Sequence, residues 1–394
     1  MPERTRRRRI GAAIRDFLTT EAAGGAALLA AAIAALLWAN LSAHSYESFW
    51  SAKSHWDIGA IELPHELRGW VTEGLMAVFF FVVGVEIKRE IVSGELQGRH
   101  KASLPVAAAI GGMLVPALIY LAINPSGTAA RGWGIPMATD IAFAIGLVTL
   151  LGDRVTHQMK VLLLGIAIAD DIGAVIVIAL FYSAGIDLGY VAAVVVLAAG
   201  LRGITRIGNP ALRQLLFGAG CIATWLMMVP SGIHASMAGI VAAGVLPERS
   251  TEGGEAEQLE RTLHRVSSFA ILPLFALASA GVVLSSSLDS LSSDLGIGVI
   301  AGLVVGKPLG IWLAAAIALR LGIARAPSGI RRRDVLALGS VAGVGFTVSL
   351  FVAGLAFPDP AQAEAARLAV LVASLIAAVV GVTIFRLTPR GRRA

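Results

Sequence analysis

The sequence contains little charge and almost no cysteine. Only 15% of its 394 residues are Asp, Glu, Lys or Arg, whereas a soluble protein of ordinary composition has about 25%. The one cysteine, Cys221, lies in an apolar run, so the chain cannot build a disulfide framework or a cysteine-based metal site. The longest predicted cytoplasmic loop is 247–266, and no segment between apolar runs is long enough for a separate soluble domain. These shortages exclude an ordinary soluble protein.

Apolar residues make up 56% of the chain and form long runs. Most runs approach about 20 residues, the length of a helix that crosses a bilayer, whereas barrel strands alternate over about 10 residues. The sequence therefore predicts an all-α, polytopic membrane protein with about 12 transmembrane helices and a single integral-membrane domain, 1–394. We place the helices at 23–42, 70–87, 102–123, 134–151, 159–183, 188–201, 212–229, 232–246, 267–284, 296–319, 334–357 and 366–386.

The basic residues are concentrated in the gaps between these runs. If the N-terminus lies in the cytoplasm, 27 of the 32 Lys and Arg fall on the cytoplasmic side and four on the other, as the positive-inside rule requires. Segments 1–22 and 387–394 are then cytoplasmic and basic. The first apolar run is long, so we expect a retained helix rather than a cleaved signal peptide. Charge spread over such gaps provides no basic face for nucleic acid, and the expected partner is the lipid bilayer.

Few ionisable residues fall within the predicted helices, and each is costly there. A charge at the bilayer centre costs about 2.5–3.5 kcal/mol on insertion scales. A structural ion pair between Lys307 and one aspartate explains two central charges but leaves two carboxylates unpaired, so we predict a functional ion site. The residues concerned are Glu73 and Glu86 near the two ends of the second helix, Asp140 in the fourth, Asp170 and Asp171 in the fifth, and Lys307 in the tenth.

The adjacent carboxylates of Asp170 and Asp171 suit cation exchange. Neighbouring residues on a helix point about 100° apart, so one can face Lys307 on another helix while the other faces a water-filled cavity. Two close carboxylates resist double ionisation and titrate as a coupled unit. Carboxylate oxygens also suit a hard cation. Such a pair can hold a proton and give it up when a cation arrives.

Two of the predicted helices contain residues that interrupt a helix. In GWGIPMATDIAFAIG, Pro136 breaks the pattern, and Thr139 or Asp140 can cap a half-helix that starts there. In GSVAGVGFTVSLF, the glycines Gly339, Gly343 and Gly345 surround a stretch without strong helix formers. A proline kink and glycine packing are the simpler readings. However, the breaks occupy corresponding places in helices three to five and ten to twelve, which is typical of a transporter site.

Seven stretches of the chain are similar to the NhaA family of bacterial Na⁺/H⁺ antiporters, and the likeness covers nearly the whole sequence. These stretches are GLMAVFFFVVGVEIKRE (74–90), IPMATDIAFAIG (135–146), IAIADDIGAVIVIALFY (166–182), SGIHASMAG (231–239), LPLFALASAG (272–281), AGLVVGKPLGI (301–311) and GVGFTVSLF (343–351). The resemblance implies inverted repeats, for which this family is a standard example, with the two interrupted helices crossing at the midplane.

The resemblance also implies an activity. The expected protein is not an enzyme and needs no cofactor. It expels Na⁺ or Li⁺ and imports H⁺, driven by the proton gradient, by alternating access. Exchange is expected to be electrogenic, with two H⁺ per Na⁺, and regulated by pH. The expected location is the bacterial inner membrane, with both termini in the cytoplasm, and a homodimer is the family expectation.

The resemblance assigns roles to the charged residues of the site. It implies that Asp171 is the direct cation ligand and that Asp170 is the partner of Lys307, with Thr139 adding an oxygen near the cation. Asp140 and Lys307 match the charges that compensate the ends of the half-helices, which carry about half a unit charge each.

A second group of residues matches the region where the family senses pH, at the cytoplasmic mouth. A solvated charged face is the alternative reading of this group. Arg261 stands where other members can have histidine, which leaves the pH set-point open. Glu73 matches an acidic position in the funnel, and His234 matches a family histidine or is a simple structural donor. The pH-sensing candidates are Glu86, Lys88, Arg89, Glu90, Glu260 and His264.

Three other functions have to be considered for such a sequence. An intramembrane aspartyl protease would need its aspartates on separate helices in a GxGD-type motif, and the nearest candidate ends at Asp153 beside a basic loop. An ion channel would pass current without proton movement. A sodium-coupled solute symporter of related fold is the nearest alternative, and it would show substrate-dependent sodium uptake.

Overall fold

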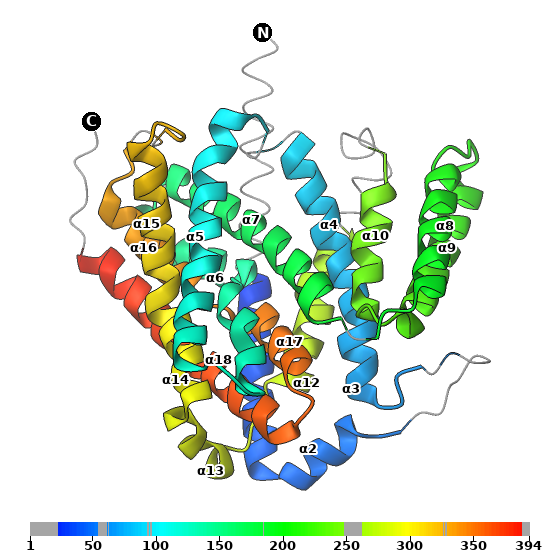
Figure 1. Cartoon of the computed structure of the whole chain (residues 1–394), viewed down its shortest axis with the longest axis horizontal. Helices are drawn as coiled ribbons and strands as arrows, with labels where there is room; N and C mark the ends of the chain where they lie inside the picture. The colour runs from blue at the N-terminus through cyan, green and yellow to red at the C-terminus, as the bar shows by residue number, and fades with distance from the viewer. Residues whose placement is uncertain are drawn as a thin grey trace. The chain divides into compact units, whose positions relative to one another are not determined.

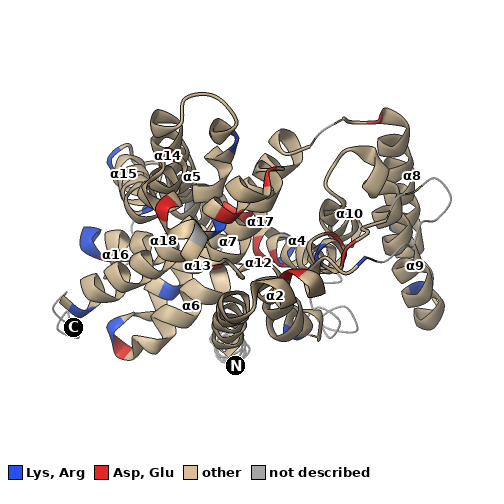
Figure 2. Ribbon diagram, turned by 90° about the horizontal axis from the view of Figure 1, so that it is seen from below, with Lys and Arg blue, Asp and Glu red and all other residues tan. Residues whose placement is uncertain are grey.

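The computed structural model describes residues 23–53, 61, 63–92, 94, 97–183, 185–247, 262–325, 327 and 329–387. Over these ranges the chain is helical and forms no β-strand, apart from one isolated bridge between Lys53 and Glu66. The prediction of an all-α fold is confirmed for the described part of the chain. Most of each helix carries no charged residue, and Lys and Arg mark several helix ends (Figure 2).

Eight helices in the described ranges are long and apolar enough to cross a membrane, or up to ten if each of two bent pairs is one span. The predicted sixth and eighth helices coincide with the shorter apolar helices Leu188–Ile204 and Ala235–Val245. Each predicted segment thus coincides with a helix or a bent pair, while twelve crossings remain a prediction. The eight are Ala23–Leu41, Leu67–Val92, Ala102–Ile123, His157–Phe181, Pro210–Ser231, Thr262–Ser279, Asp294–Arg320 and Pro360–Leu387.

The chain divides into two compact units, and the single-domain organisation remains a prediction. The first unit comprises Met1–Ile33, Arg99–Asp170 and Leu284–Ala394, and the second comprises Ala34–Gly98 and Asp171–Val283. Helix α7, His157–Phe181, belongs to both, because the boundary falls after Asp170. In the 18-residue apolar stretch of α7, 61% of the residues are buried, whereas in that of Pro210–Ser231 only 11% are buried. The helix with the two aspartates is therefore an interior one.

The first unit contains the two broken helices. The axis bends by 44° between η2 and α6, and by 51° between α16 and α17. Both breaks lie where Pro136 and the glycines predicted them. The elements of this unit, besides α7, are α5 (Arg99–Ile123), η2 (Ala129–Met137), α6 (Ile141–Leu150), η3 (Gly152–Arg154), α13 (Leu284–Ser287), η8 (Leu288–Ser292), α14 (Asp294–Ala301), η9 (Gly302–Gly306), α15 (Lys307–Arg320), α16 (Arg332–Ala342), α17 (Phe346–Ala356) and α18 (Pro360–Leu387).

Helices α5 and α15 run side by side in this unit (Figure 1). They approach so closely that a Cβ added to Gly111 would overlap the carbonyl of Gly310, and one added to Gly310 would overlap the carbonyl of Gly111. Small residues permit such backbone contact between membrane helices. Around it lies a core of buried apolar side chains, among them Ile145, Leu163 and Leu338. This packing fixes the start of α15, where Lys307 lies.

The second unit contains helices whose ends are set by local capping. Asn209 caps α9 by accepting from Leu212 N at 3.1 Å, and Pro210 occupies the first helical position, where its missing N–H is not needed. Besides part of α7, the elements are α2 (Ala43–Trp50), α3 (Leu67–Gly69), η1 (Trp70–Leu75), α4 (Met76–Val92), α8 (Leu188–Ile204), α9 (Pro210–Met228), η4 (Val229–Ser231), η5 (Ala235–Met237), α10 (Ala238–Val245), η7 (Ser267–Ile271) and α12 (Leu272–Ser279).

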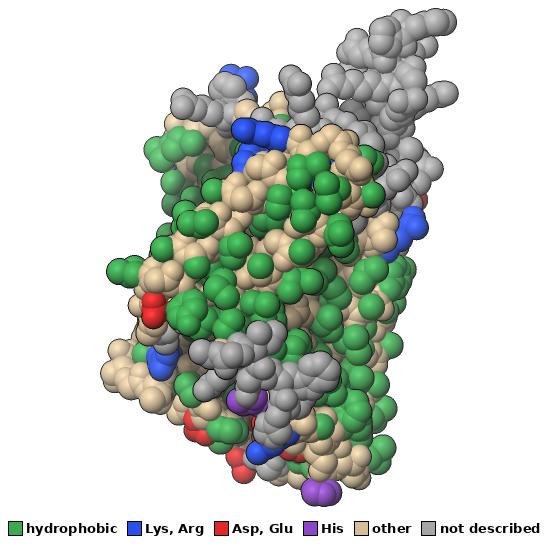
Figure 3. All heavy atoms as spheres, turned by 90° about the vertical axis from the view of Figure 1, so that its right-hand side faces the viewer, with side chains coloured by type: hydrophobic (Ala, Val, Ile, Leu, Met, Phe, Trp, Pro, Cys, Tyr) green, Lys and Arg blue, Asp and Glu red, His purple; other side chains and the backbone are tan. Residues whose placement is uncertain are grey.

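Helices α8 and α9 pack against each other and expose an apolar face. Figure 3 shows hydrophobic side chains gathered over this side of the molecule. Val196 on α8 and Leu215 on α9 are each 70% exposed. In water such a surface would be unfavourable, since burial of apolar area is worth about 25 cal/mol per Å². The face is suited to lipid, as expected for a multi-pass membrane protein.

Candidate ion-binding site

The two helix breaks lie against each other in the first unit. The amide of Asp140 donates to the carbonyl of Val344 at 2.7 Å, so a backbone hydrogen bond joins the two breaks. The hydroxyl of Thr139 donates to the carbonyl of Ala342, the last residue of α16, at 2.9 Å. The final carbonyls of a helix have no intrahelical donor, so Thr139 supplies one to α16 from the other broken helix.

One carboxylate serves the N-termini of both half-helices. Asp140 is buried and is the N-cap of α6, where its Oδ1 accepts from Phe143 N at 2.9 Å. Its Oδ2 accepts from the amide of Thr347 at 3.1 Å and from the Thr347 hydroxyl at 2.7 Å. Thr347 lies in the first turn of α17. Each N-terminus carries about half a positive charge, so the two together offset one carboxylate.

Lys307 places a cation at the opposite kind of helix end. It is fully buried at the start of α15, and its Nζ donates to the carbonyl of Met137, the last residue of η2. The same Nζ lies 2.7 Å from Asp170 Oδ2. The contact predicted between Asp170 and Lys307 is therefore present. A buried pair of this kind is stable only while both partners remain, because each ion alone has lost its hydration.

The second oxygen of the Asp170 carboxylate is not used by the pair. Asp170 Oδ1 is buried and accepts no hydrogen bond from the described residues. Thr139 faces this carboxylate with its hydroxyl and its amide. Asp171, the next residue of α7, is also buried, with 6% of its surface exposed. An unsatisfied, buried carboxylate oxygen beside a second carboxylate has the chemistry of a position for a proton or a hard cation.

Glycine on α5 leaves room for Ile311, one turn after Lys307 in α15. A Cβ added to Gly112 would lie 2.7 Å from Ile311 Cγ1 and 3.8 Å from Lys307 Cδ. A larger residue there would overlap Ile311, whereas its contact with the stem of Lys307 would be an ordinary one. The close helix contact that begins at Gly111 and Gly310 thus continues to the site.

Two hydroxyls of α17 were not predicted as part of the site. Thr347 binds Asp140, and Ser349 Oγ donates to the carbonyl of Ile135 at 2.7 Å. Both are fully buried. The signal was present in GFTVSLF, where two hydroxyl residues stand two positions apart directly after the glycines of the break. Their partners depend on which helices cross, and that cannot be read from one segment.

Four of the six predicted pH-sensing residues fall at the end of α4, in the second unit. Lys88 Nζ donates to the carbonyls of Gly244 and Leu246 at the end of α10. Arg89 lies 3.7 Å from Glu90 Oε1, and Glu86 and Glu90 are both 8% exposed. His264 is half-buried in the α-helical segment that leads into η7, and Glu260 lies outside the described residues. Lys88 therefore caps a helix, and the sensing role of the group remains a prediction.

Glu73 and His234 also lie in the second unit, away from helix centres. Glu73 is part of η1, and its carbonyl accepts from Trp225 Nε1 at 3.0 Å. His234 precedes η5, and its Nδ1 lies 2.8 Å from Ser236 Oγ. The contact of His234 fits the simple structural reading. The funnel role of Glu73 is still a prediction.

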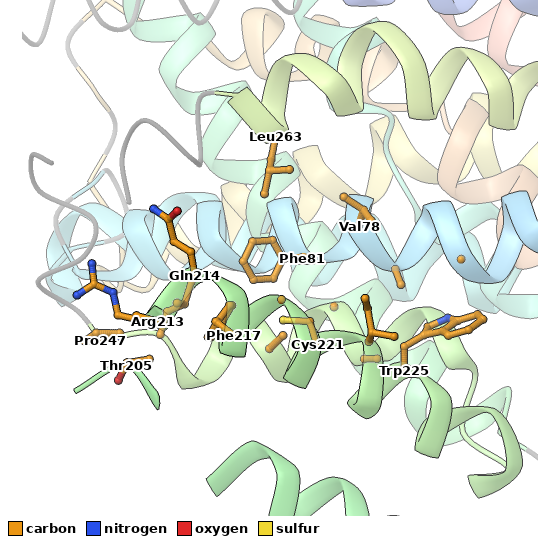
Figure 4. A pocket seen from close by; sticks show the side chains of 18 of the residues that line it. Val78, Phe81, Thr205, Arg213, Gln214, Phe217, Cys221, Trp225, Pro247 and Leu263 are labelled. Atoms are coloured by element: carbon orange, nitrogen blue, oxygen red, sulfur yellow. The ribbon is translucent and has the colours of Figure 1, made fainter. Parts of the chain in front are cut away.

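An apolar cavity of about 840 Å³ lies between α4, α9 and α10 in the second unit. Arg213 and Gln214 stand at one end, and Trp225 stands at the other, with Phe81 of α4 facing α9 (Figure 4). None of the described residues that line it is Asp or Glu. A mostly apolar lining without a carboxylate is a poor match for a hard cation, so the charged cluster of the first unit is the candidate ion site.

Comparison with known proteins gives matches over almost the entire chain. The family model described as Na⁺/H⁺ antiporter 1 matches residues 15–385. The Na⁺/H⁺ antiporter NhaA of Serratia proteamaculans (strain 568) is 44% identical over 388 residues, which cover 96% of this chain and 99% of the relative. The protein of the same name from Shewanella sp. (strain W3-18-1) is 44% identical over 375 residues, covering 94% and 96%. That from Oleidesulfovibrio alaskensis is 41% identical over 434 residues, covering 97% and 95%.

Proposed function

The chain belongs to the Na⁺/H⁺ antiporter 1 family, and on that premise we propose that it carries Na⁺ or Li⁺ out of the cytoplasm in exchange for external H⁺. Exchange is electrogenic, with two H⁺ per cation. The protein works by alternating access, in the inner membrane of a bacterium, with both termini in the cytoplasm. It is regulated by pH through the charged group at the end of α4, and it forms a homodimer.

The single observation that carries the proposal is the buried Asp170–Lys307 pair with its unused carboxylate oxygen. The charge of Asp140 is offset by two helix N-termini, and Lys307 offsets Asp170. The remaining charge of the site is negative. It comes from the carboxylate of Asp171 and from the C-terminal ends of η2 and α16, and each of these two helix ends carries about half a negative charge. A site with this balance attracts a small cation or protons.

The geometry supports a sequence of steps. A cation that enters from the cytoplasm takes Asp171 and the free oxygen of Asp170 as ligands, with Thr139 adding its oxygen. Binding draws Asp170 away from Lys307, whose ammonium then has no counter-charge in a buried position and releases a proton. A second proton leaves the aspartate pair. On the external side the cation leaves and both protons return, so one net charge moves in each cycle.

The test is a pH dye in everted membrane vesicles that have been acidified by respiration. Addition of Na⁺ or Li⁺ restores dye fluorescence, and K⁺ at the same concentration does not. Asp170→Asn and Asp171→Asn each nearly abolish the response, while the amount of protein in the membrane is unchanged. Near-normal activity of both variants would remove the site assignment. Fluorescence that recovers only with an added organic solute would favour the sodium-coupled symporter.

Competition between the cation and protons is a second consequence of a shared site. As pH falls below the optimum, the apparent KM for Na⁺ rises by up to about tenfold per pH unit for each competing proton. The measurement is a titration of KM over at least two units of pH. A flat curve would show that protons and cations occupy different groups.

A further inference from the structure

Thr347 touches neither Asp170 nor Lys307 in the described contacts, yet it makes two of the hydrogen bonds on Asp140. The amide is held by helix α17, whereas the hydroxyl bond at 2.7 Å depends on the side chain. Hydrogen bonds to a charged acceptor are short and about twice as strong as neutral ones. The Thr347 side chain is 2% exposed, so no bulk water can replace its hydroxyl.

Asp140 is joined to the ion pair by a short stretch of backbone. The residues before it, Met137 to Thr139, contain the carbonyl that accepts from Lys307 and the hydroxyl and amide that face Asp170. Asp140 itself is bound through its amide to Val344 in the other break. If its carboxylate moves, this whole stretch moves with it, and so does the position of Lys307 relative to Asp170.

We propose that Thr347 is a positioning residue for transport: its hydroxyl holds the Asp140 carboxylate across the two helix N-termini, and it thereby fixes residues 137–140 against the Asp170–Lys307 pair. The inference rests on the proposed exchange of Na⁺ for H⁺. Thr347 binds no cation and carries no proton in this scheme. It acts only through Asp140.

Ser349 provides a matched control on the same helix. It lies two residues further along α17, is fully buried, and donates its hydroxyl at the same distance of 2.7 Å. Its acceptor is the carbonyl of Ile135 and not a carboxylate. Removal of its hydroxyl therefore costs a buried hydrogen bond between the same two broken helices without touching Asp140.

The experiment compares variants in everted vesicles and, after purification, in liposomes. Thr347→Val keeps the shape and loses the hydroxyl, and we expect the maximal rate of Na⁺-driven proton movement to fall about tenfold, as for loss of one hydrogen bond to a charged group. Thr347→Ser keeps the hydroxyl and restores the rate to within about twofold of the wild type. Equal rates for wild type and Thr347→Val, or failure of Thr347→Ser to restore the rate, would overturn the proposal.

A double-mutant cycle separates positioning from general loss of stability. In an Asp140→Asn background, Thr347→Val lowers the rate by less than about twofold, because the charged acceptor is already gone, whereas Ser349→Ala has the same effect in both backgrounds. If Thr347→Val lowered the rate by the same factor in the wild-type and Asp140→Asn backgrounds, the proposal would be contradicted. The same cycle is run on the thermal unfolding midpoint of detergent-purified protein, so a variant too slow to assay still gives an answer. Absence of Na⁺-driven proton movement in the wild type would instead contradict the proposed function.

Discussion

The two broken helices have similar bends, 44° and 51°, and opposite composition. The break between η2 and α6 contains Thr139 and Asp140, while the break between α16 and α17 is Gly343, Val344 and Gly345, without a polar side chain. Asp140 nevertheless reaches the N-terminus of α17, and Thr139 reaches the C-terminus of α16. The first broken helix thus supplies polar groups at the ends of both.

The second break itself supplies space, and the hydroxyls of its helix, on Thr347 and Ser349, come only after it. A Cβ on Gly343 would lie 2.5 Å from the carbonyl of Leu303 and 3.1 Å from that of Ser340. A Cβ on Gly345 would lie 3.1 Å from the carbonyl of Ala138. Equal geometry in two parts of a transporter therefore does not require equal chemistry. A substitution in the first break removes a charge or a hydrogen bond, whereas one in the second creates overlap.

The largest effect is expected from Lys307, the only cation that serves one of these helix ends in the described contacts. Lys307→Ala leaves Asp170 buried without its partner, which costs about 3–5 kcal/mol of unfolding free energy. Adding Asp170→Asn recovers most of that loss, because no unpaired charge remains. Thermal unfolding of the purified variants gives both values. A single variant as stable as the wild type would show that the pair contributes nothing.

The same variant tests the charge that moves in transport. Wild-type exchange in liposomes follows a potassium diffusion potential set with valinomycin, since one charge per cycle is worth about 2.3 kcal/mol per 100 mV. Any exchange left in Lys307→Ala is electroneutral and ignores the sign of the potential. Wild-type exchange that ignores it would rule out two H⁺ per cation.

The second-largest effect is expected at the glycines of the second break, where steric overlap can be compared with a simple gain of backbone flexibility. Gly343→Ala forces a methyl group against two carbonyls and destabilises the protein by about 1–3 kcal/mol. The reverse exchange in the first break, Ala138→Gly, only loosens the backbone and costs about 0.5–1 kcal/mol. Unfolding midpoints of the two variants decide the point. Equal losses of stability in the two variants would mean that steric overlap is not the reason for glycine in the second break.

A smaller loss is expected for Asp140→Asn. Asparagine has one acceptor oxygen and can cap one helix as aspartate does, but its NH2 group cannot accept from the second N-terminus, where Asp140 Oδ2 accepts from Thr347. The variant therefore loses the charge beside two helix dipoles and one of the two caps, about 1–2 kcal/mol. Asp187→Asn is the control, because Asp187 is an exposed cap of one helix, α8, with Gly189 N as donor at 2.7 Å. We expect Asp187→Asn to lower the thermal unfolding midpoint less than Asp140→Asn does. A larger loss at Asp187 would contradict the double role of Asp140.

The smallest effect concerns the hydroxyl that links the two breaks. Thr139→Val leaves the carbonyl of Ala342 without its donor and costs about 1 kcal/mol of unfolding free energy. Thr139→Ser retains the hydrogen bond and the stability. Apparent KM for Na⁺ is measured alongside, since Thr139 also faces the cation in the proposed steps. A stability of Thr139→Val equal to that of Thr139→Ser would show that the bond is not needed.

Features with local causes were predictable from sequence. Run length predicted where helices lie, since an apolar helix has to be as long as the bilayer is thick. Pro136 and the glycines predicted both breaks, and Asp140 was one of two predicted caps. Counting buried charges also predicted that Lys307 would pair with an aspartate.

Features that depend on the tertiary arrangement were not predictable. The bond from Thr347 to Asp140 and that from Ser349 to Ile135 require the two broken helices to be side by side. The role of Lys88 as a cap of α10 arises from the packing of α4 against that helix. A single sequence shows that such polar groups exist, but only the crossing of helices selects the partner of each.

The shared cap on Asp140 has a consequence for the order of synthesis. Asp140 and Thr347 are 207 residues apart in the chain. At about 5–20 residues per second, the ribosome takes about 10–40 s to make α17 after α6 has emerged. During that interval the Asp140 carboxylate has not yet met Thr347, and for most of it the C-terminal end of η2 has not yet met Lys307. The first broken helix must therefore be kept in a wet or protein-lined place at the insertion machinery until the eleventh predicted helix arrives, so the site is completed among the last steps of assembly.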